Sequence, residues 1–212
     1  MLSALKSNFY VMKSFLRILI ICQIALIIFG HSINSAYCYL FYPTFAGIFM
    51  PINVSTQEST SSFTPFLLSS PISRKNVVLS KYLSVFSYCI PALFISSIFM
   101  VILGDANAYD AIRSFIIDCS IIILGVSIVT PLTFIFKPQH VTVIFIAICF
   151  APAIITTIAV KKLDDITIDK IELLFTNFYN NISNLILVLV ISVIILAISN
   201  IISIIAFNKK EF

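Results

Sequence analysis

The chain has 212 residues, of which 60% are hydrophobic and only 10% are charged, and its mean hydropathy is +1.10. A soluble domain carries about 25% charged residues, so this chain has too few to cover a water-facing surface, and a soluble globular protein is excluded. The net charge is +4, but the cations stand at the ends of apolar runs, where membrane topology explains them without a nucleic-acid partner.

Residues 1–16 have the pattern of a helix that lies in the plane of the lipid headgroups. Five apolar side chains recur at steps of three and four residues and form one stripe, and three cations follow an edge of it. An ordinary cytosolic lead-in to the first span is the alternative. The apolar residues are Leu2, Leu5, Phe9, Met12 and Leu16, and the cations are Lys6, Lys13 and Arg17.

Six apolar runs are candidates for crossing a membrane, which takes about 20 mostly apolar residues. The first two are separated by almost nothing and should form a tight hairpin. The sequence therefore predicts an all-α, polytopic membrane protein with a single transmembrane domain. The runs cover residues 16–33, 36–54, 77–103, 111–136, 141–160 and 184–207.

The lysines and arginines decide the predicted orientation. With the N-terminus in the cytoplasm, nine of the 13 lysines and arginines fall on the cytoplasmic side and four fall outside. This is the bias of the positive-inside rule. We therefore expect both ends of the chain in the cytoplasm.

Residues 55–76 form the largest cytoplasmic loop of this scheme. They are too polar to span a membrane, yet Phe63, Phe66 and Leu67 make a small apolar element within them. Pro71 follows, and Ser73 can cap a helix that begins at Arg74 and continues into the third span. Apolar side chains exposed on a cytosolic loop indicate a protein partner. The alternative is a plain connector whose cations only satisfy the positive-inside bias.

Two polar residues stand inside predicted spans and are candidates for a substrate pathway. Gln23 lies in the middle of the first span, where packing between helices is the favoured interpretation and a substrate contact the alternative. Asp118 lies about two turns into the fourth span. It could pair with Arg113 or line the outer mouth of a pathway, and the sequence does not decide between them.

Residues 161–183 form the longest outer segment. Ile171, Leu174, Phe175 and Phe178 recur in it at helical spacing. This pattern predicts a short amphipathic helix that caps or re-enters the outer leaflet. A helix that rests on the surface fits nearly as well.

Motifs for catalysis, metal binding and nucleotide binding are absent from the sequence. The five cysteines are scattered in apolar segments without metal-ligand spacing, and His31 and His140 fall at opposite faces of the membrane. No glycine-rich loop precedes Lys-Ser or Lys-Thr, so the chain itself should bind no ATP. We therefore expect no metal, no cofactor and no enzymatic activity of its own.

The loop and the start of the third span carry a family pattern. After the second span comes a polar loop with an acidic residue, Glu58, then a leucine-proline-small-serine-arginine motif in which Ser70 stands for the leucine, and then Val-x-x-Ser-Lys-Tyr. This pattern, with the span count and the orientation, resembles the ABC-2 type permeases, the six-span transmembrane subunits of bacterial ABC transporters. The matching residues are Pro71, Ile72, Ser73, Arg74, Lys75, Val78, Leu79, Ser80, Lys81 and Tyr82.

The resemblance implies a coupling helix in the loop, docked in a groove on a separate ATP-binding subunit. Phe63, Phe66 and Leu67 would supply buried contacts, Arg74 and Lys75 would supply complementary charge, and the movement would reach the bundle around Glu58 and Lys81. The N-terminal helix would be the connecting helix, and the segment 161–183 an outer gate.

The same resemblance implies a bacterial cytoplasmic membrane protein that exports its cargo as a dimer of permease subunits, with ATP on the partner. Antimicrobial or amphipathic peptides, or other hydrophobic compounds, are the expected cargo by analogy alone. A membrane scaffold or peptide-immunity protein that acts without ATP is the alternative function. An intramembrane enzyme is a third hypothesis.

Overall fold

The computed structural model describes residues 2–33, 35, 37–60, 73–160 and 165–209. Within these ranges the chain is helical apart from short turns, so the predicted all-α fold is confirmed. The helices are α1 (Leu2–Ser32), α2 (Tyr37–Thr60), α4 (Arg74–Ile102), α5 (Ala108–Ile135), α6 (Pro138–Val160), α7 (Asp165–Asn180) and α8 (Ile182–Asn208).

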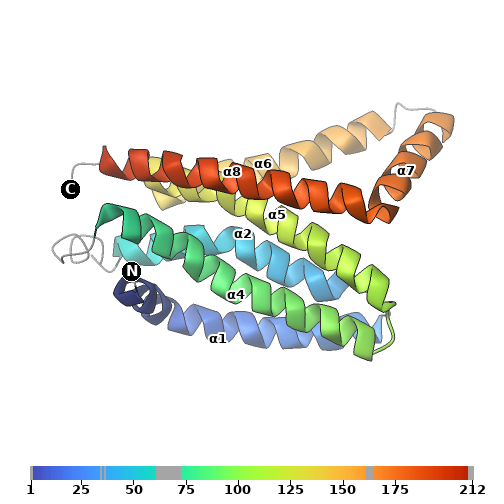
Figure 1. Cartoon of the computed structure of the whole chain (residues 1–212), viewed down its shortest axis with the longest axis horizontal. Coiled ribbons are helices and arrows are strands. Elements are labelled where there is room, and N and C mark those ends of the chain that lie inside the picture. Colours follow the sequence, from blue (N-terminus) through green and yellow to red (C-terminus); the bar gives the residue numbers. More distant parts are fainter. Residues whose placement is uncertain (1, 34, 36, 61–72, 161–164, 210–212) are drawn as a thin grey trace.

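The long helices run side by side along one direction, and α7 lies across one end of them (Figure 1). At the opposite end α2 finishes at Thr60 and α4 begins at Arg74, and α1 also starts and α8 also finishes there. We call this the loop end and the other the α7 end. The described part of α7 confirms the helix predicted within residues 161–183.

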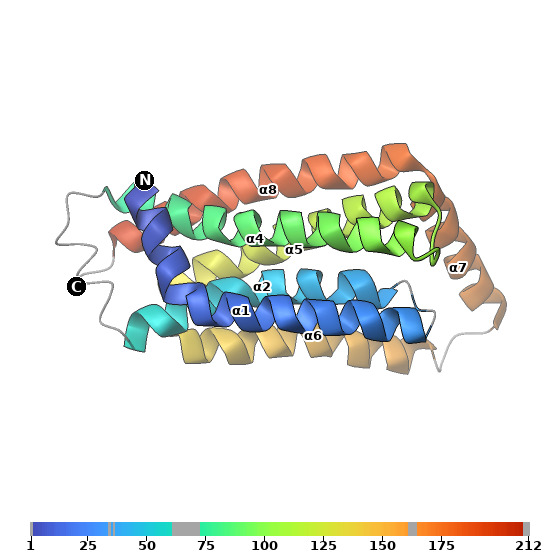
Figure 2. The same cartoon turned by 90° about the horizontal axis from the view of Figure 1, so that it is seen from below.

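The predicted headgroup helix and first span are joined in α1 without a break between Leu2 and Ser32. Figure 2 shows that the first part of α1 is set at an angle to the rest, as a change from the headgroup plane to a span would require. Its position in the headgroups stays a prediction. The expected hairpin between the first two runs is confirmed, because α2 begins at Tyr37.

Three helices, α4, α5 and α8, are long and apolar enough to cross a membrane by length and composition. In the part of the chain that the structure describes, Leu16–Ser32 and Pro138–Ile148 are shorter apolar stretches. The count of six spans and their orientation therefore stay predictions.

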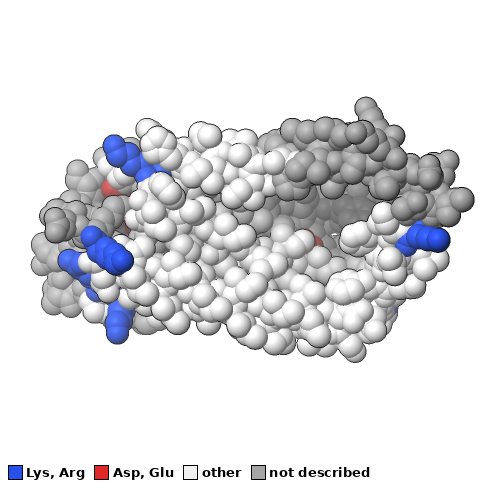
Figure 3. Space-filling model, turned by 90° about the horizontal axis from the view of Figure 1, so that it is seen from above, with Lys and Arg blue, Asp and Glu red and all other residues white. Residues whose placement is uncertain are grey.

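α8 has the inverted polarity of a helix that faces lipid. Its buried positions include Ser192, Ser199 and Ser203, while Ile194 and Ile201 are 55% and 60% exposed. A helix on the surface of a soluble protein buries its apolar residues instead, whereas small residues between membrane helices let the backbones approach. On the face shown in Figure 3, lysine and arginine lie toward the two ends and most of the middle is uncharged.

α2 is the central helix and packs against α1, α4, α5 and α6. Glycines allow two of these approaches. A Cβ atom on Gly47 would lie 2.8 Å from Sγ of Cys89 on α4, and one on Gly125 of α5 would lie 2.6 Å from Cγ1 of Ile48. Both distances are shorter than van der Waals contact allows. Therefore α2 can lie this close to α4 and α5 only because residues 47 and 125 are glycines.

Gly125→Val should destabilise the bundle, because the added side chain overlaps Ile48. Overpacking typically costs about 1–3 kcal/mol, and valine avoids the gain of about 1 kcal/mol in helix propensity that alanine would bring. Thermal unfolding in a mild detergent measures the change. Adding Ile48→Ala should restore much of the loss, and Ile128→Ala, on the exposed side of α5, is the control. Equal melting temperatures for Gly125→Val and the native chain would contradict the packing.

Candidate functional site

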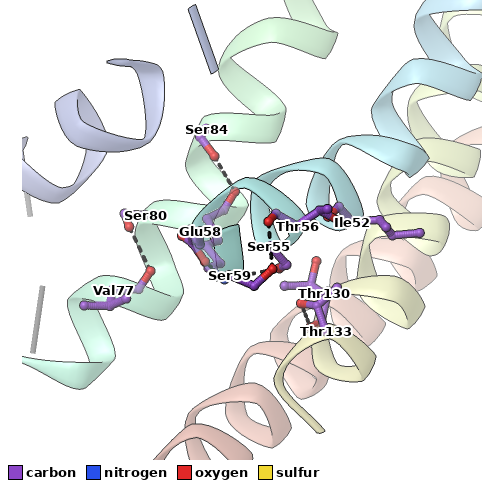
Figure 4. Close-up of polar contacts among 11 residues, drawn as sticks. Ile52, Ser55, Thr56, Glu58, Ser59, Val77, Ser80, Ser84, Thr130 and Thr133 are labelled. Carbon is purple, nitrogen blue, oxygen red and sulfur yellow. Dashed lines mark hydrogen bonds and ion pairs between the residues drawn. The ribbon is translucent and has the colours of Figure 1, made fainter. Parts of the chain in front are cut away.

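A buried ion pair joins α2 to α4 at the loop end. Nζ of Lys81 lies 2.6 Å from a carboxylate oxygen of Glu58, and the two side chains are only 8% and 7% exposed. Glu58 belongs to the last turns of α2, beside α4 (Figure 4). Lys81 belongs to the second turn of α4, so the pair joins the two helices next to the loop that connects them.

The ion pair is surrounded by both polar and aromatic groups. Nζ of Lys81 also donates a hydrogen bond of 3.3 Å to Ser55 and lies 4.6 Å above the ring of Phe134 on α5. The second carboxylate oxygen of Glu58 is buried and has no hydrogen-bond partner among the described residues. Because a buried charge costs several kcal/mol unless it is paired, Glu58 and Lys81 depend on each other to stay inside.

Local sequence places both charges. Ser73 caps α4 as predicted, with its hydroxyl accepting a bond of 3.4 Å from the backbone N–H of Asn76, and the helix begins at Arg74. α2 runs to Thr60, beyond the predicted boundary at residue 54. Glu58 therefore lies on α2, and not in the cytoplasmic loop of residues 55–76 where it was expected, and its carboxylate reaches Lys81 on α4.

The residue after Lys81 ties α4 to a third helix. The hydroxyl of Tyr82 lies 2.7 Å from the Ser199 hydroxyl and 2.8 Å from that of Ser203, both on α8. Ser199 in turn donates to the backbone carbonyl of Ser127 on α5 at 2.6 Å. The start of α4 is thus joined to α2 through Lys81 and to α8 and α5 through Tyr82.

The other residues expected to meet the ATPase divide into two groups. Arg74 and Lys75 are exposed at the loop end, and Arg74 also donates a bond of 3.0 Å to the last carbonyl of α8, at Asn208. This contact suits a cation at a helix C-terminus. The remaining expected residues, Phe63, Phe66, Leu67 and Pro71, lie outside the described part of the chain.

Gln23 is buried and joins α1 to α4. Its amide nitrogen donates to the carbonyl of Ala92 at 2.9 Å and to the hydroxyl of Ser96 at 2.8 Å. The hydroxyl of Tyr88 donates to the amide oxygen at 3.4 Å. These contacts match the packing role that the sequence favoured for Gln23.

Asp118 does not contact Arg113. Its carboxylate accepts a hydrogen bond of 3.0 Å from the hydroxyl of Thr44 on α2. Arg113 binds Asn180 instead, through bonds of 2.6 and 3.2 Å, and lies 3.5 Å from Asp110. The side chain of Arg113 therefore fastens the end of α7 to α5, and of the two roles considered for Asp118 the pairing with Arg113 is not formed.

A second polar cluster stands at the α7 end. Asp105, in the turn between α4 and α5, accepts a hydrogen bond from Tyr39 at the start of α2 and lies 3.3 Å from His31 at the end of α1. The hydrogen bond from Tyr39, more than the contact with His31, holds the pKa of Asp105 below its ordinary value. Within the described residues, no three metal-binding side chains gather at this or another place.

Comparison with protein families identifies the type of chain that carries this geometry. Residues 5–208 match the family described as ABC-2 family transporter protein. The chain belongs to this family. The comparisons with curated proteins and with solved structures found no match.

Membership in the ABC-2 family confirms the resemblance found in the sequence. The chain is a membrane protein and the permease component of an ABC transporter, and such a component is not itself catalytic. The family implies association with a membrane and with an ABC ATPase. In this ABC-2 permease, the ion pair of Glu58 and Lys81 joins α2 to α4 at the base of the expected docking loop.

The ion pair itself was missed by sequence reasoning, although both residues were named. Glu58 and Lys81 were assigned separately to the coupling region, because they lie on either side of the loop. The usable signal is a pair of opposite charges, each set a turn or two inside an apolar helix next to the same loop. Neither charge is tolerated there without a partner.

Glu58→Gln and Lys81→Met should each destabilise the protein by about 3–5 kcal/mol, because each change leaves the other charge buried without its partner. The double variant should recover much of this loss. Lys75→Met, an exposed position on the same helix, should change stability by less than about 1 kcal/mol. Thermal unfolding of the four purified variants tests this, and single variants as stable as Lys75→Met would contradict a buried pair.

The cluster at Asp105 should make stability depend on pH in the acid range. The pKa of Asp105 is lower in the folded chain than in an unfolded chain, where it is about 3.9. Its contribution is therefore complete above that value and is lost as the pH falls through the folded pKa. Asp105→Asn and Tyr39→Phe should both reduce the loss of melting temperature below about pH 4. An unchanged acid profile in both variants would contradict the assignment.

Proposed function

We propose that the chain is the permease subunit of an ATP-driven exporter in a bacterial cytoplasmic membrane. It crosses the membrane six times, with both ends in the cytosol. The observation that carries the proposal is the family match over residues 5–208. The excess of cations on the proposed cytosolic side supports the orientation. The arrangement in which α1 starts and α8 finishes at the loop end supports a common side for both ends and the loop.

The loop end is the proposed docking site of the ATPase. Phe63, Phe66 and Leu67 enter an apolar groove on the ATPase, where burial of their side chains supplies affinity. Arg74 and Lys75 stand exposed beside the loop and face acidic groups at the rim of that groove. Charges at a rim chiefly set the rate and specificity of association.

The buried pair gives the loop a mechanical connection to the bundle. When two ATPase subunits close on ATP, they push on the loop and on the first turns of α4. Lys81 passes the displacement to α2 through Glu58, and Tyr82 passes it to α8 through Ser199 and Ser203. Two permease subunits, as copies or relatives, surround the pathway, and the helix α7 forms part of its outer gate.

The proposed cargo is an amphipathic or antimicrobial peptide or another hydrophobic compound. ATP is bound by the partner subunits alone, and the permease requires no cofactor of its own. The exposed isoleucines and phenylalanines of the spans tolerate such a cargo as they tolerate lipid.

Phe66→Asp should abolish association with the ATPase, because it places a charge in the apolar contact. The test extracts the complex from its native membrane in a gentle detergent and measures how much protein of the size of an ATP-binding subunit co-purifies. Ser59→Asp is the matched control, since it adds the same charge at an exposed position at the end of α2. Both variants should keep the native melting temperature.

Association that survives Phe66→Asp would show that the loop is not the docking element. A native chain that brings down no ATP-binding subunit would favour a scaffold or immunity protein that acts without ATP.

A further inference from the structure

Asp118 has its carboxylate in the interior of the predicted fourth span, away from both ends of α5. It lies about three turns into α5, which begins at Ala108. Among the acidic side chains that the structure describes, Glu58 lies in the last turns of α2, Asp105 in the turn between α4 and α5, and Asp110 in the first turn of α5. An ionisable residue within a membrane helix is costly, and it usually pairs with another residue or marks a pathway.

Asp118 has no counterion in the described part of the chain. The ion pairs formed there join Glu58 to Lys81, Arg113 to Asp110 and His31 to Asp105. The nearest basic residue along α5 is Arg113, which forms a hydrogen bond with Asn180 and an ion pair with Asp110. The ring of Tyr109 lies 3.9 Å from its guanidinium group. The polar partner of Asp118 is the hydroxyl of Thr44, which also donates to the carbonyl of Leu40 at 2.8 Å. A neutral hydroxyl leaves the charge of the carboxylate uncompensated.

A ladder of phenylalanines runs along α2 next to this carboxylate. The rings of Phe41 and Phe45 are stacked with centroids 5.8 Å apart, and those of Phe45 and Phe49 are 4.5 Å apart. Phe41 and Phe45 are 65% and 47% exposed. Thr44 is three residues from Phe41, so the two side chains are neighbours on the helix surface. The hydroxyl that holds Asp118 therefore stands beside the exposed end of the ladder.

The inner end of the ladder packs against α6. α6 diverges from α8 toward the α7 end (Figure 1), and Phe145 of α6 meets the inner end of the ladder, with its ring 4.7 Å from that of Phe49. Figure 3 shows a hollow in the face that contains α6 and α8, and an acidic side chain is visible in it.

We propose that Asp118, Thr44, Phe41 and Phe45 form a binding site for the cationic group of an amphipathic cargo. The carboxylate supplies the missing charge complement, and the faces of the two exposed rings attract a cation through their quadrupole. The low dielectric of the bilayer strengthens both attractions. The apolar part of the cargo lies along the ladder toward Phe49. An anionic amphiphile of the same shape meets only repulsion from Asp118.

The proposal rests on the proposed export function for its biological meaning, but it can be tested on the isolated permease. Two probes of the same shape and opposite charge are suited to it, tetraphenylphosphonium and tetraphenylborate. Binding of each to the purified chain in a neutral detergent is measured by equilibrium dialysis. The native chain should bind the phosphonium, and it should bind the borate at least about tenfold more weakly, which corresponds to about 1.4 kcal/mol.

Three variants separate the charge from the packing. Asp118→Asn should weaken binding of tetraphenylphosphonium about tenfold or more, while Asp118→Glu should retain most of it because the charge remains. Phe45→Leu should also weaken it, since leucine keeps an apolar surface but has no ring. Phe99→Leu, an exposed phenylalanine on α4, is the control and should leave binding unchanged. Melting temperatures measured without probe show that each variant is folded.

Each outcome decides the proposal. If Asp118→Asn binds the phosphonium as well as the native chain, the carboxyl group is neutralised by a proton or by another part of the chain, and the site is wrong. Equal binding of the two probes by the native chain would also overturn it. These measurements need no ATPase, so a permease that fails to associate with an ATPase but shows the predicted charge preference would refute the exporter and leave the site standing.

Discussion

A buried charge is costly without an opposite charge beside it, and at the loop end of this protein Glu58 and Lys81 meet that requirement for each other. Their contact of 2.6 Å is formed between helices on either side of the proposed docking loop. It therefore fixes where the loop leaves the bundle and where it returns. Because Tyr82 follows Lys81 and bonds to α8, the start of α4 is connected to α8 as well as to α2. The proposed coupling mechanism depends on this connection.

The other helices are held together by weaker contacts. Lipid gives helices little hydrophobic reason to associate, so close packing and interhelical hydrogen bonds replace it. Gln23 joins α1 to α4, Ser199 joins α8 to α5, and Gly47 and Gly125 let α2 lie between its neighbours. The site proposed at Asp118 differs from these contacts, because its carboxylate is oriented by Thr44 but not neutralised by a described residue.

Sequence reasoning predicted the features that depend on neighbouring residues. The all-α fold, the hairpin after Ser32 and the Ser73 cap follow from composition, spacing and local chemistry. Contacts between distant helices were not accessible, and Glu58 with Lys81 is the clearest case. Arg113 was a poor candidate partner for Asp118 for a geometric reason. Two residues five apart on a helix point about 140° away from each other, so Arg113 reaches α7 while Asp118 faces α2.

The sidedness of the loop end tests the account most directly, because an ATPase can reach only the cytosolic face. Cysteine is introduced at Ser59 or at Lys75, which flank the loop and are both exposed, and a membrane-impermeant maleimide is applied to intact cells and to inverted vesicles. The unaltered chain, with its own five cysteines, gives the background. We expect labelling above background only in inverted vesicles. Labelling of either position from outside intact cells would contradict the account.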